Sequence, residues 1–272
     1  MSIELFGREI ALQKKAEQKI ITQQLEKRGI QPCLCIIRDS QNPVIEKYVT
    51  LKKKYGADIG IEVNDILTSP ENLAAEIERA NQDSNIHGII LQFPISQPER
   101  ATELTALIAS QKDVDGLNET QSDFVSATAT AILWFLEGNK INLVNKKIAL
   151  VGYGRLIGRP LEKIFQSHQY NFQIFRSADE ARLATELINF DVIISATGQP
   201  SLIKSDMLKD GAIVVDAGTA SEQGKIIGDV SDSARRRSDL QISAKFGGVG
   251  PLTITVLFEH TLQAAQKQLK KE

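Results

Sequence analysis

Short apolar runs alternate with amphipathic segments along the chain, and this alternation restricts the fold more than any other feature of the sequence. In the first third, the predicted helices are 8–28, 43–55 and 70–82, and the predicted strands are 32–38, 60–63 and 87–95. Strands that alternate with helices build largely parallel sheets whose two faces are both covered. We therefore expect an α/β fold.

A second block of the same kind begins near residue 145. After a first strand that contains the run IALV, the predicted strands are 172–177, 191–198 and 212–218, and a long predicted helix follows at 252–271. We expect two α/β domains across a cleft, the second a Rossmann-like parallel sheet. The predicted domains are 1–118, completed by the C-terminal helix 252–272, and 119–251.

The charge balance excludes several classes of function. The 272 residues include 32 Lys and Arg against 34 Asp and Glu, which leaves a net charge of −2. Nucleic-acid binding and polybasic membrane anchoring both need a basic surplus, so neither nucleic acid nor a membrane is an expected partner. No apolar run approaches the roughly 18 residues that cross a bilayer, and charged residues interrupt the N-terminus where a signal peptide would be apolar.

Cys33 and Cys35 are the two cysteines of the chain. Residues two apart in a strand point to the same face and are hard to bridge, and a C-x-C pair supplies only two metal ligands. The sequence therefore predicts buried free thiols, no metal site and a reducing, cytoplasmic location.

Three glycines, Gly152, Gly154 and Gly158, follow the apolar run IALV and precede a helix-like segment. In this context glycine permits a sharp turn and a close approach of the backbone to phosphate, next to a helix N-terminus. The spacing G-x-G-x-x-x-G is one residue longer than the common dinucleotide fingerprint, so a tight turn without a ligand is the alternative.

The next strand ends in Arg176 and Ser177, where NAD enzymes usually place an acidic residue for the ribose 2′-hydroxyl. A guanidinium fork and a hydroxyl suit a 2′-phosphate instead. NADP is thus the expected cofactor, with NAD as the alternative, and an ordinary solvated arginine is the reading without a ligand.

Polar residues on the first domain could carry chemistry. Tyr48 and Lys52 are four residues apart and share one helix face, where a lysine in apolar surroundings has a lowered pKa and can shuttle protons. Gln92 interrupts an apolar strand near its carboxyl end, where α/β sheets bind ligands. A solvated helix face and a structural amide are the alternatives.

Two further segments complete the candidate set. In KDVDG, Asp113 and Asp115 lie two apart, so that one can hold the turn while the other faces the cleft. The segment GGVGPLT, over 247–253, is a glycine-dense turn with Pro251 at the start of a helix.

Five segments together resemble one family, the bifunctional methylenetetrahydrofolate dehydrogenase/methenyltetrahydrofolate cyclohydrolases. They are YVTLKKKYGADIGI, NQDSNIHGIILQFPI, KDVDG, GRLIGRP and GGVGPLT, in the family's order and at its usual distances. The resemblance implies a folate-binding first domain, a second domain that binds NADP or NAD, and a homodimer. It implies hydride transfer from methylenetetrahydrofolate to the cofactor, followed by hydrolysis of methenyltetrahydrofolate to formyltetrahydrofolate.

The resemblance also implies roles for individual residues. Lys52 would be the catalytic lysine of the hydrolytic step, Tyr48 would stack on the folate, and Gln92 would position the folate and tune Lys52. Asp115 would bind the pterin edge. The remaining implied contacts are Gly248 and Pro251 on the folate side, and Gly152, Tyr153, Gly154, Arg176, Ser177 and Thr219 on the cofactor side.

The sequence departs from the family pattern at several places. Ile45 stands where the family has serine, Tyr153 lies inside the cofactor turn, and SATATAI occupies 126–132 in place of a Pro-Cys-Thr-Pro stretch. These departures leave two alternatives: a folate- or nucleotide-binding homologue that has lost turnover, and an oxidoreductase of the same architecture with another small substrate.

Overall fold

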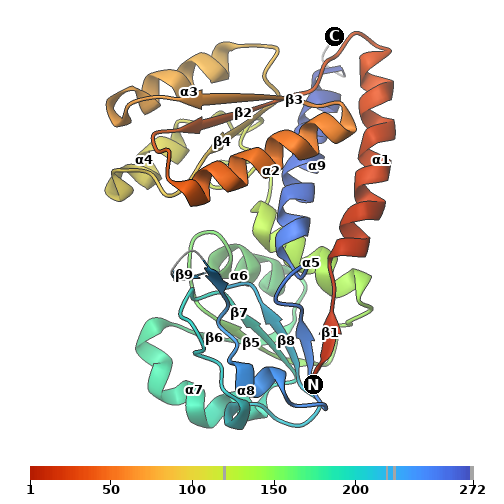
Figure 1. Cartoon of the computed structure of the whole chain (residues 1–272), viewed down its shortest axis with the longest axis vertical. Coiled ribbons are helices and arrows are strands. Elements are labelled where there is room, and N and C mark those ends of the chain that lie inside the picture. Colours follow the sequence, from red (N-terminus) through yellow and green to blue (C-terminus); the bar gives the residue numbers. More distant parts are fainter. Residues whose placement is uncertain (119–120, 219, 223–224, 270–272) are drawn as a thin grey trace. The chain divides into compact units, whose positions relative to one another are not determined.

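The structure is a computed structural model that describes residues 1–118, 121–218, 220–222 and 225–269. The chain divides into two compact units (Figure 1). The first, termed the three-stranded unit, comprises Leu12–Ala127 and Ile254–Glu272. The second, termed the six-stranded unit, comprises Met1–Ala11 and Thr128–Thr253.

The three-stranded unit is built on a parallel sheet of order β3-β2-β4. Its strands are β2 (Cys33–Arg38), β3 (Glu62–Leu67) and β4 (Gly88–Leu91). Its helices are α2 (Pro43–Ile59), α3 (Leu73–Gln82) and α4 (Ala101–Ala106), with most of α1 (Arg8–Glu26) and of α9 (Gly250–Leu269). Figure 1 shows α2 and α3 on opposite faces of this sheet, so that both faces are covered.

The burial of β2 explains its unbroken apolar sequence. Cys33, Cys35 and Ile37 pack with α3 and α4, while the residues between them, Leu34 and Ile36, are fully buried on the other face. The two cysteines are free thiols, and burial raises the pKa of each to about 12, which keeps them protonated and unreactive.

The six-stranded unit contains a parallel sheet of order β1-β11-β8-β7-β5-β6. The strands are β1 (Ile3–Leu5), β5 (Lys147–Val151), β6 (Asn171–Phe175), β7 (Val192–Ser195), β8 (Ile213–Asp216) and β11 (Gln241–Ser243), and β9 (Ala220–Glu222) pairs with β10 (Lys225–Ile227) in a hairpin. The helices are α5 (Ala127–Gly138), α6 (Gly158–Ser167), α7 (Glu180–Glu186) and α8 (Asp232–Arg235). The expected α/β class with a Rossmann-like parallel sheet is confirmed.

The strand order places a topological switch point at β5, because the next two strands of the chain, β6 and β7, lie on opposite sides of it. Doubly wound sheets bind ligands at such a point, outside the carboxyl ends of the strands. The order β6-β5-β7-β8-β11 therefore marks the ends of β5, β6 and β7 as the place to look for a ligand site.

Several predicted boundaries differ from the structure. The strand predicted over 60–63 corresponds to β3, which begins two residues later than predicted. The start is shifted because Gly60, in a left-handed conformation (φ 84°), is the C-cap of α2. Residues 1–11, which the sequence assigns to the first domain, group with the six-stranded unit in the structure, where the three-residue strand β1 pairs with β11.

None of the helices in the described part of the chain has the length and apolar character needed to span a membrane.

Candidate functional site

Lys52 lies on the buried stripe of α2. The buried residues of this helix recur at helical spacing and are Ile45, Val49, Lys52, Gly56 and Ile59. Only 7% of Lys52 is exposed. A charged residue at a core position of an amphipathic helix is costly unless it is paired or neutral, so its surroundings decide its state.

Gln92 supplies the hydrogen-bond partner of Lys52. The Lys52 Nζ donates to Gln92 Oε1 over 2.6 Å, and both side chains are buried. Gln92 follows β4, where its backbone N–H donates to the Ile37 carbonyl. Its own amide nitrogen donates to the Phe93 carbonyl over 2.8 Å, which orients the amide with its oxygen toward the lysine.

Burial lowers the pKa of Lys52 from its ordinary value of 10.5, and the negative charge of Asp115 opposes this shift. Desolvation disfavours the ammonium form, so the neutral amine is populated at lower pH than in an exposed lysine. An amine whose pKa is lowered in this way can accept and return a proton at lower pH than an exposed lysine.

The two carboxylates of KDVDG have different roles. Asp113 is fully buried and accepts hydrogen bonds from the backbone N–H groups of Leu117 (3.2 Å) and Asn118 (2.8 Å). Asp115 is partly exposed and acts electrostatically on Lys52. The turn is thus held by Asp113, and Asp115 is the carboxylate of the Lys52 site.

Tyr48 lies one helical turn before Lys52 on α2 and is partly exposed. The spacing of four residues places the two side chains next to each other along the helix surface. A half-exposed phenol beside a buried amine offers an aromatic face and a hydrogen-bonding hydroxyl to a ligand.

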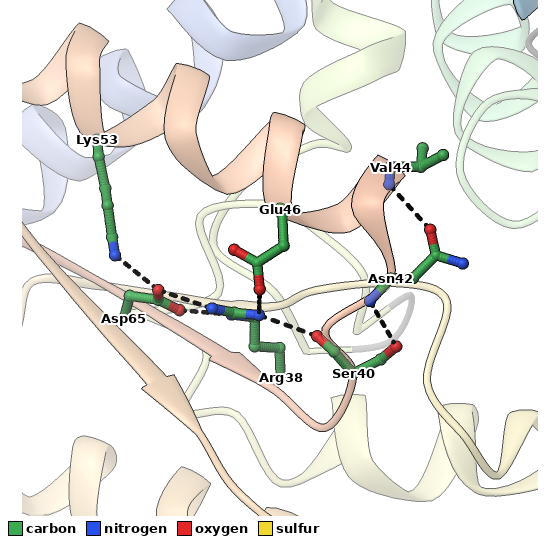
Figure 2. Close-up of polar contacts among 7 residues, drawn as sticks. All are labelled: Arg38, Ser40, Asn42, Val44, Glu46, Lys53 and Asp65. Carbon is green, nitrogen blue, oxygen red and sulfur yellow. Dashed lines mark hydrogen bonds and ion pairs between the residues drawn. The ribbon is translucent and has the colours of Figure 1, made fainter. Parts of the chain in front are cut away.

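A network of charged residues, which sequence reasoning missed, fixes α2 to the sheet (Figure 2). Arg38, at the end of β2, binds Asp65 of β3 through two hydrogen bonds of 2.7 and 3.1 Å and binds Glu46 of α2 with another nitrogen. Lys53 of α2 also reaches Asp65, over 2.7 Å. Glu46 and Lys53 flank the part of α2 that carries Tyr48 and Lys52, so this network sets the position of both.

Burial alone would raise the pKa of Asp65, but hydrogen bonds from Arg38 and Lys53 outweigh it and hold this pKa below its ordinary value. The Asp65 side chain is only 8% exposed and that of Arg38 only 7%. The pair is therefore a buried bidentate ion pair, in which each charge depends on the other.

In the six-stranded unit, a cavity of about 400 Å³ lies at the carboxyl ends of β5, β6 and β7. The residues Gly152, Tyr153, Gly154, Arg176 and Ser177, all predicted as cofactor contacts, line it together. The lining residues that sequence reasoning missed are Val151, Phe175, Glu180, Leu183, Ala196, Thr197, Gln199 and Leu202. The glycine turn and the next strand end thus form one site at the switch point of the sheet.

Close packing explains two of the three glycines. Gly152 has a φ of 102°, and a Cβ there would lie 2.5 Å from the Ala196 carbonyl oxygen. A Cβ on Gly158 would lie 2.4 Å from the Gly152 carbonyl oxygen. Gly154 has open space around it, which leaves its backbone accessible to a ligand.

Tyr153 and Arg176 form a stacked pair at this cavity. The Arg176 guanidinium carbon lies 4.2 Å from the centre of the Tyr153 ring, and the Tyr153 hydroxyl bonds Glu162 of α6. The guanidinium is thereby held over an aromatic ring by a cation–π contact. Arg176 also begins a short turn in which its N–H donates to Asp179 over 2.9 Å.

Asp229 supports the far edge of the cavity and also went unpredicted. It is fully buried and accepts hydrogen bonds from the Ser195 hydroxyl (2.7 Å) and from the Thr197 N–H (2.8 Å). A Cβ on Gly218 would lie only 2.0 Å from its carboxylate. The hydrogen bond from Thr197 therefore fixes the loop after β7, and close packing against Asp229 requires glycine at position 218.

Three predicted contacts are not among the residues that line this cavity. Gly248 and Pro251 belong to the six-stranded unit, at the turn before α9 and in its first turn. A Cβ on Gly248 would lie 2.6 Å from the Ala244 carbonyl oxygen, so tight packing of the turn requires glycine there. Thr219 lies outside the described residues. Among the residues that the structure describes, no cluster of three or more His, Cys, Asp or Glu side chains could hold a metal ion.

Comparison with protein families gives two matches that together span most of the chain. The catalytic domain of tetrahydrofolate dehydrogenase/cyclohydrolase matches residues 5–115, and the NAD(P)-binding domain of the same enzymes matches residues 126–269. The bifunctional protein FolD of Anoxybacillus flavithermus is 32% identical, with 97% of this chain and 98% of the relative covered. That of Lactobacillus acidophilus is 33% identical, with 96% and 95% covered.

Solved structures agree with these matches. The bifunctional FolD methylenetetrahydrofolate dehydrogenase/cyclohydrolase of Campylobacter jejuni superimposes with a TM-score of 0.90 at 29% identity, over 98% of this chain and 100% of that one. The Trypanosoma brucei methylenetetrahydrofolate dehydrogenase-cyclohydrolase, solved with NADP and an inhibitor, superimposes with a TM-score of 0.88 at 26% identity, over 99% of each chain.

Proposed function

The chain belongs to the tetrahydrofolate dehydrogenase/cyclohydrolase family, and from this premise we propose that it is a bifunctional enzyme of one-carbon metabolism. It oxidises methylenetetrahydrofolate to methenyltetrahydrofolate by hydride transfer to NADP. It then hydrolyses the methenyl product to formyltetrahydrofolate. The hydrogen bond between Lys52 and Gln92 is the single observation that carries this proposal, because it joins a buried amine to an oriented amide.

Lys52 moves protons in the hydrolytic step. Water adds to the methenyl carbon and loses a proton to the Lys52 amine, whose pKa is lowered by burial. The ammonium then returns a proton to a folate nitrogen as the bond between that nitrogen and the methenyl carbon breaks. The hydroxyl group on the same carbon loses its proton to solvent as the carbonyl of the formyl group forms. Gln92 Oε1 accepts a hydrogen bond from Nζ and so holds the amine in place.

The folate is bound by residues around Lys52. Tyr48 offers its ring as a stacking surface. Asp115 accepts hydrogen bonds from the N–H groups of the pterin edge, and its charge also supports the protonated state of Lys52. Gly248 and Pro251 are further folate contacts, as the family resemblance implies.

NADP supplies the hydride acceptor when it is bound, and the cavity of the six-stranded unit fits it. The backbone of Gly152 and Gly154 approaches the phosphates, and Tyr153 and Ser177 line the same space. Thr219 is proposed as a contact near the nicotinamide. Hydride transfer itself requires mainly that these groups hold the reactants in position.

Arg176 selects NADP over NAD. Its guanidinium is held against Tyr153 and can form charge-assisted hydrogen bonds with a 2′-phosphate. We expect Arg176→Ala to raise the KM for NADP about 10- to 100-fold, as the loss of such bonds implies, and to leave the KM for NAD unchanged. Arg236→Ala, at an exposed arginine outside the cavity, is the control.

Initial-rate assays of dehydrogenation with NADP and with NAD, alongside hydrolysis of added methenyltetrahydrofolate, test the proposal. Activity in both assays supports it. A protein that binds folate but shows neither activity would be a binding homologue without turnover, and absence of folate binding would indicate another substrate. Equal effects of Arg176→Ala on the two cofactors would refute the role of this arginine.

The active form is a homodimer in the cytoplasm. The homodimer follows from the family resemblance, and Phe6 (46% exposed) and Phe246 (76% exposed) are large apolar side chains that a subunit contact would cover. The free thiols of Cys33 and Cys35 are consistent with a reducing compartment. Light scattering after gel filtration measures the mass; a monomer at assay concentrations would contradict the dimer.

A further inference from the structure

A histidine from α9 holds the segment that carries Asp115. His260 is buried (6% exposed), and its Nδ1 lies 2.8 Å from the carbonyl oxygen of Val114. A carbonyl oxygen can only accept a hydrogen bond, so the proton of this bond is on Nδ1. His260 and Val114 are 146 residues apart in the sequence.

The ring of His260 is fixed in orientation as well as in position. It stacks on Phe124, with the ring centres 4.8 Å apart and the planes inclined by 26°. Lys267, also on α9, lies over the Phe124 ring at 4.9 Å from its centre and pairs with Asp123 over 3.2 Å. Burial lowers the pKa of His260 below its ordinary value of 6.5, although the bond to Val114 opposes this shift, so the neutral ring with hydrogen on Nδ1 is favoured.

The Val114 carbonyl belongs to the peptide group that precedes Asp115. Because that group is planar, a partner for its carbonyl oxygen also sets the direction of the Asp115 N–H and of the Asp115 Cα. The Asp113 carboxylate holds the residues after the turn, Leu117 and Asn118. His260 therefore acts on the part of the segment that the Asp113 carboxylate does not bind.

We propose that His260 is a positioning residue for Asp115, acting through the Val114 carbonyl. This inference rests on the proposed function, since Asp115 is there a folate contact and a charge that acts on Lys52. His260 touches neither substrate nor the amine. It sets where the carboxylate lies, so its effect is expected in folate binding more than in the chemical step.

Two substitutions at this position separate positioning from simple loss of packing. His260→Leu keeps an apolar side chain of similar size and removes the donor. His260→Asn restores a donor, because the asparagine amide nitrogen can occupy the place of Nδ1. We expect His260→Leu to raise the KM for methylenetetrahydrofolate about three- to tenfold with kcat within about twofold, as expected for one lost hydrogen bond. In His260→Asn, the KM for methylenetetrahydrofolate should return most of the way to the wild-type value.

Thr261→Val is the matched control. Thr261 is the next residue of α9, is fully buried and donates to the Leu257 carbonyl over 2.8 Å, so the valine variant also loses one buried hydrogen bond. It leaves the Val114 contact intact. An equal rise in KM for Thr261→Val and His260→Leu, an unchanged KM in His260→Leu, or failure of the folded His260→Asn to rescue would each overturn the proposal.

Amide hydrogen exchange over residues 110–118 gives a second readout that does not need substrate. We expect the amides of residues 110–118 to exchange faster in His260→Leu than in the wild type, and at nearly the wild-type rate in His260→Asn and Thr261→Val. If the wild-type protein shows no turnover, the proposed function fails while this readout still decides the role of His260. If His260→Leu does not fold, His260→Met, which also lacks a donor, replaces it, and exchange and KM equal to wild type in that variant would refute the proposal.

Discussion

Substitution of Lys52 by methionine separates the two proposed activities. Methionine has a similar length and suits a buried position, but it can neither accept nor return a proton. General acid–base catalysis contributes about 10²–10⁴-fold, which corresponds to about 3–5 kcal/mol of activation free energy. We expect hydrolysis of methenyltetrahydrofolate to fall by this factor, while NADP-dependent dehydrogenation stays within about tenfold because it depends mainly on positioning.

The structure also predicts the stability of this variant. Gln92 Oε1 loses its donor, at a cost of about 1–3 kcal/mol for a buried acceptor. The loss is offset because the folded state no longer buries an amine whose charged form is disfavoured. A net change of about 1 kcal/mol would move the unfolding midpoint by about 2–4 °C, so the protein should remain folded at the assay temperature.

The assay follows the absorbance of added methenyltetrahydrofolate as it is hydrolysed, without NADP, and a separate assay follows NADPH formation. Lys54→Met is the matched control, since Lys54 is an exposed lysine on the same helix. A wild-type rate of hydrolysis in a folded Lys52→Met protein would refute the role of this amine. Equal loss of both activities would show that the substitution disturbs folate binding rather than proton transfer.

Three other substitutions test separate parts of the account. Asp115→Asn removes the charge that raises the pKa of Lys52, so the limb of the hydrolysis pH profile that reports this lysine should move to lower pH; a limb that does not move would contradict the coupling. Arg38→Met leaves Asp65 buried without its main partner and should lower the free energy of unfolding by about 3–5 kcal/mol in urea titrations. In the wild type, the stability that Asp65 contributes is complete above about pH 4 and is lost as the pH falls through its lowered pKa, and this acid-dependent loss should be smaller in Arg38→Met, in which Lys53 is the remaining partner. Gly152→Ala forces a Cβ to within 2.5 Å of the Ala196 carbonyl oxygen at a φ of 102°, so calorimetry should show NADP binding weakened at least about tenfold; unchanged affinity would mean that the turn does not bind the cofactor.

The sequence predicts the buried elements of the fold well, for a physical reason. A strand covered on both faces, such as β2, needs apolar residues at every position, and this produces an unbroken run. In helix α2, the buried residues are three or four positions apart in the sequence, and Lys52 is one of them. The sequence pattern alone therefore shows a lysine at a position where an apolar residue is expected, although it does not show the partner of that lysine.

Other elements could not be predicted because long-range contacts form them. Strand β1 has three residues, with Ile3 58% exposed, and only its pairing with β11, more than 230 residues later, makes it a strand. Helix α5 is apolar on nearly every side, so it lacks the polar face that periodicity detects. The strand predicted at 60–63 begins two residues later, at Glu62, because Gly60 caps α2.

The residues of the candidate site could be predicted from the sequence, but the residues that hold them in position could not. Glycine spacing and the polar end of β6 indicated the cavity at the switch point, and family resemblance indicated the pairing of Lys52 with Gln92. Arg38, Asp229 and His260 carry no local motif. Each was missed because its partner lies on another element and only the folded chain shows the pairing.

The most direct test of the central claim is rapid mixing of the wild-type protein with methylenetetrahydrofolate and NADP, with NADPH and methenyltetrahydrofolate recorded together. The account predicts that NADPH rises and stays while methenyltetrahydrofolate rises and then falls faster than its spontaneous hydrolysis allows, because Lys52 and Gln92 hydrolyse it. No NADPH, or methenyltetrahydrofolate that accumulates one-for-one with NADPH and decays only at the spontaneous rate, would contradict it.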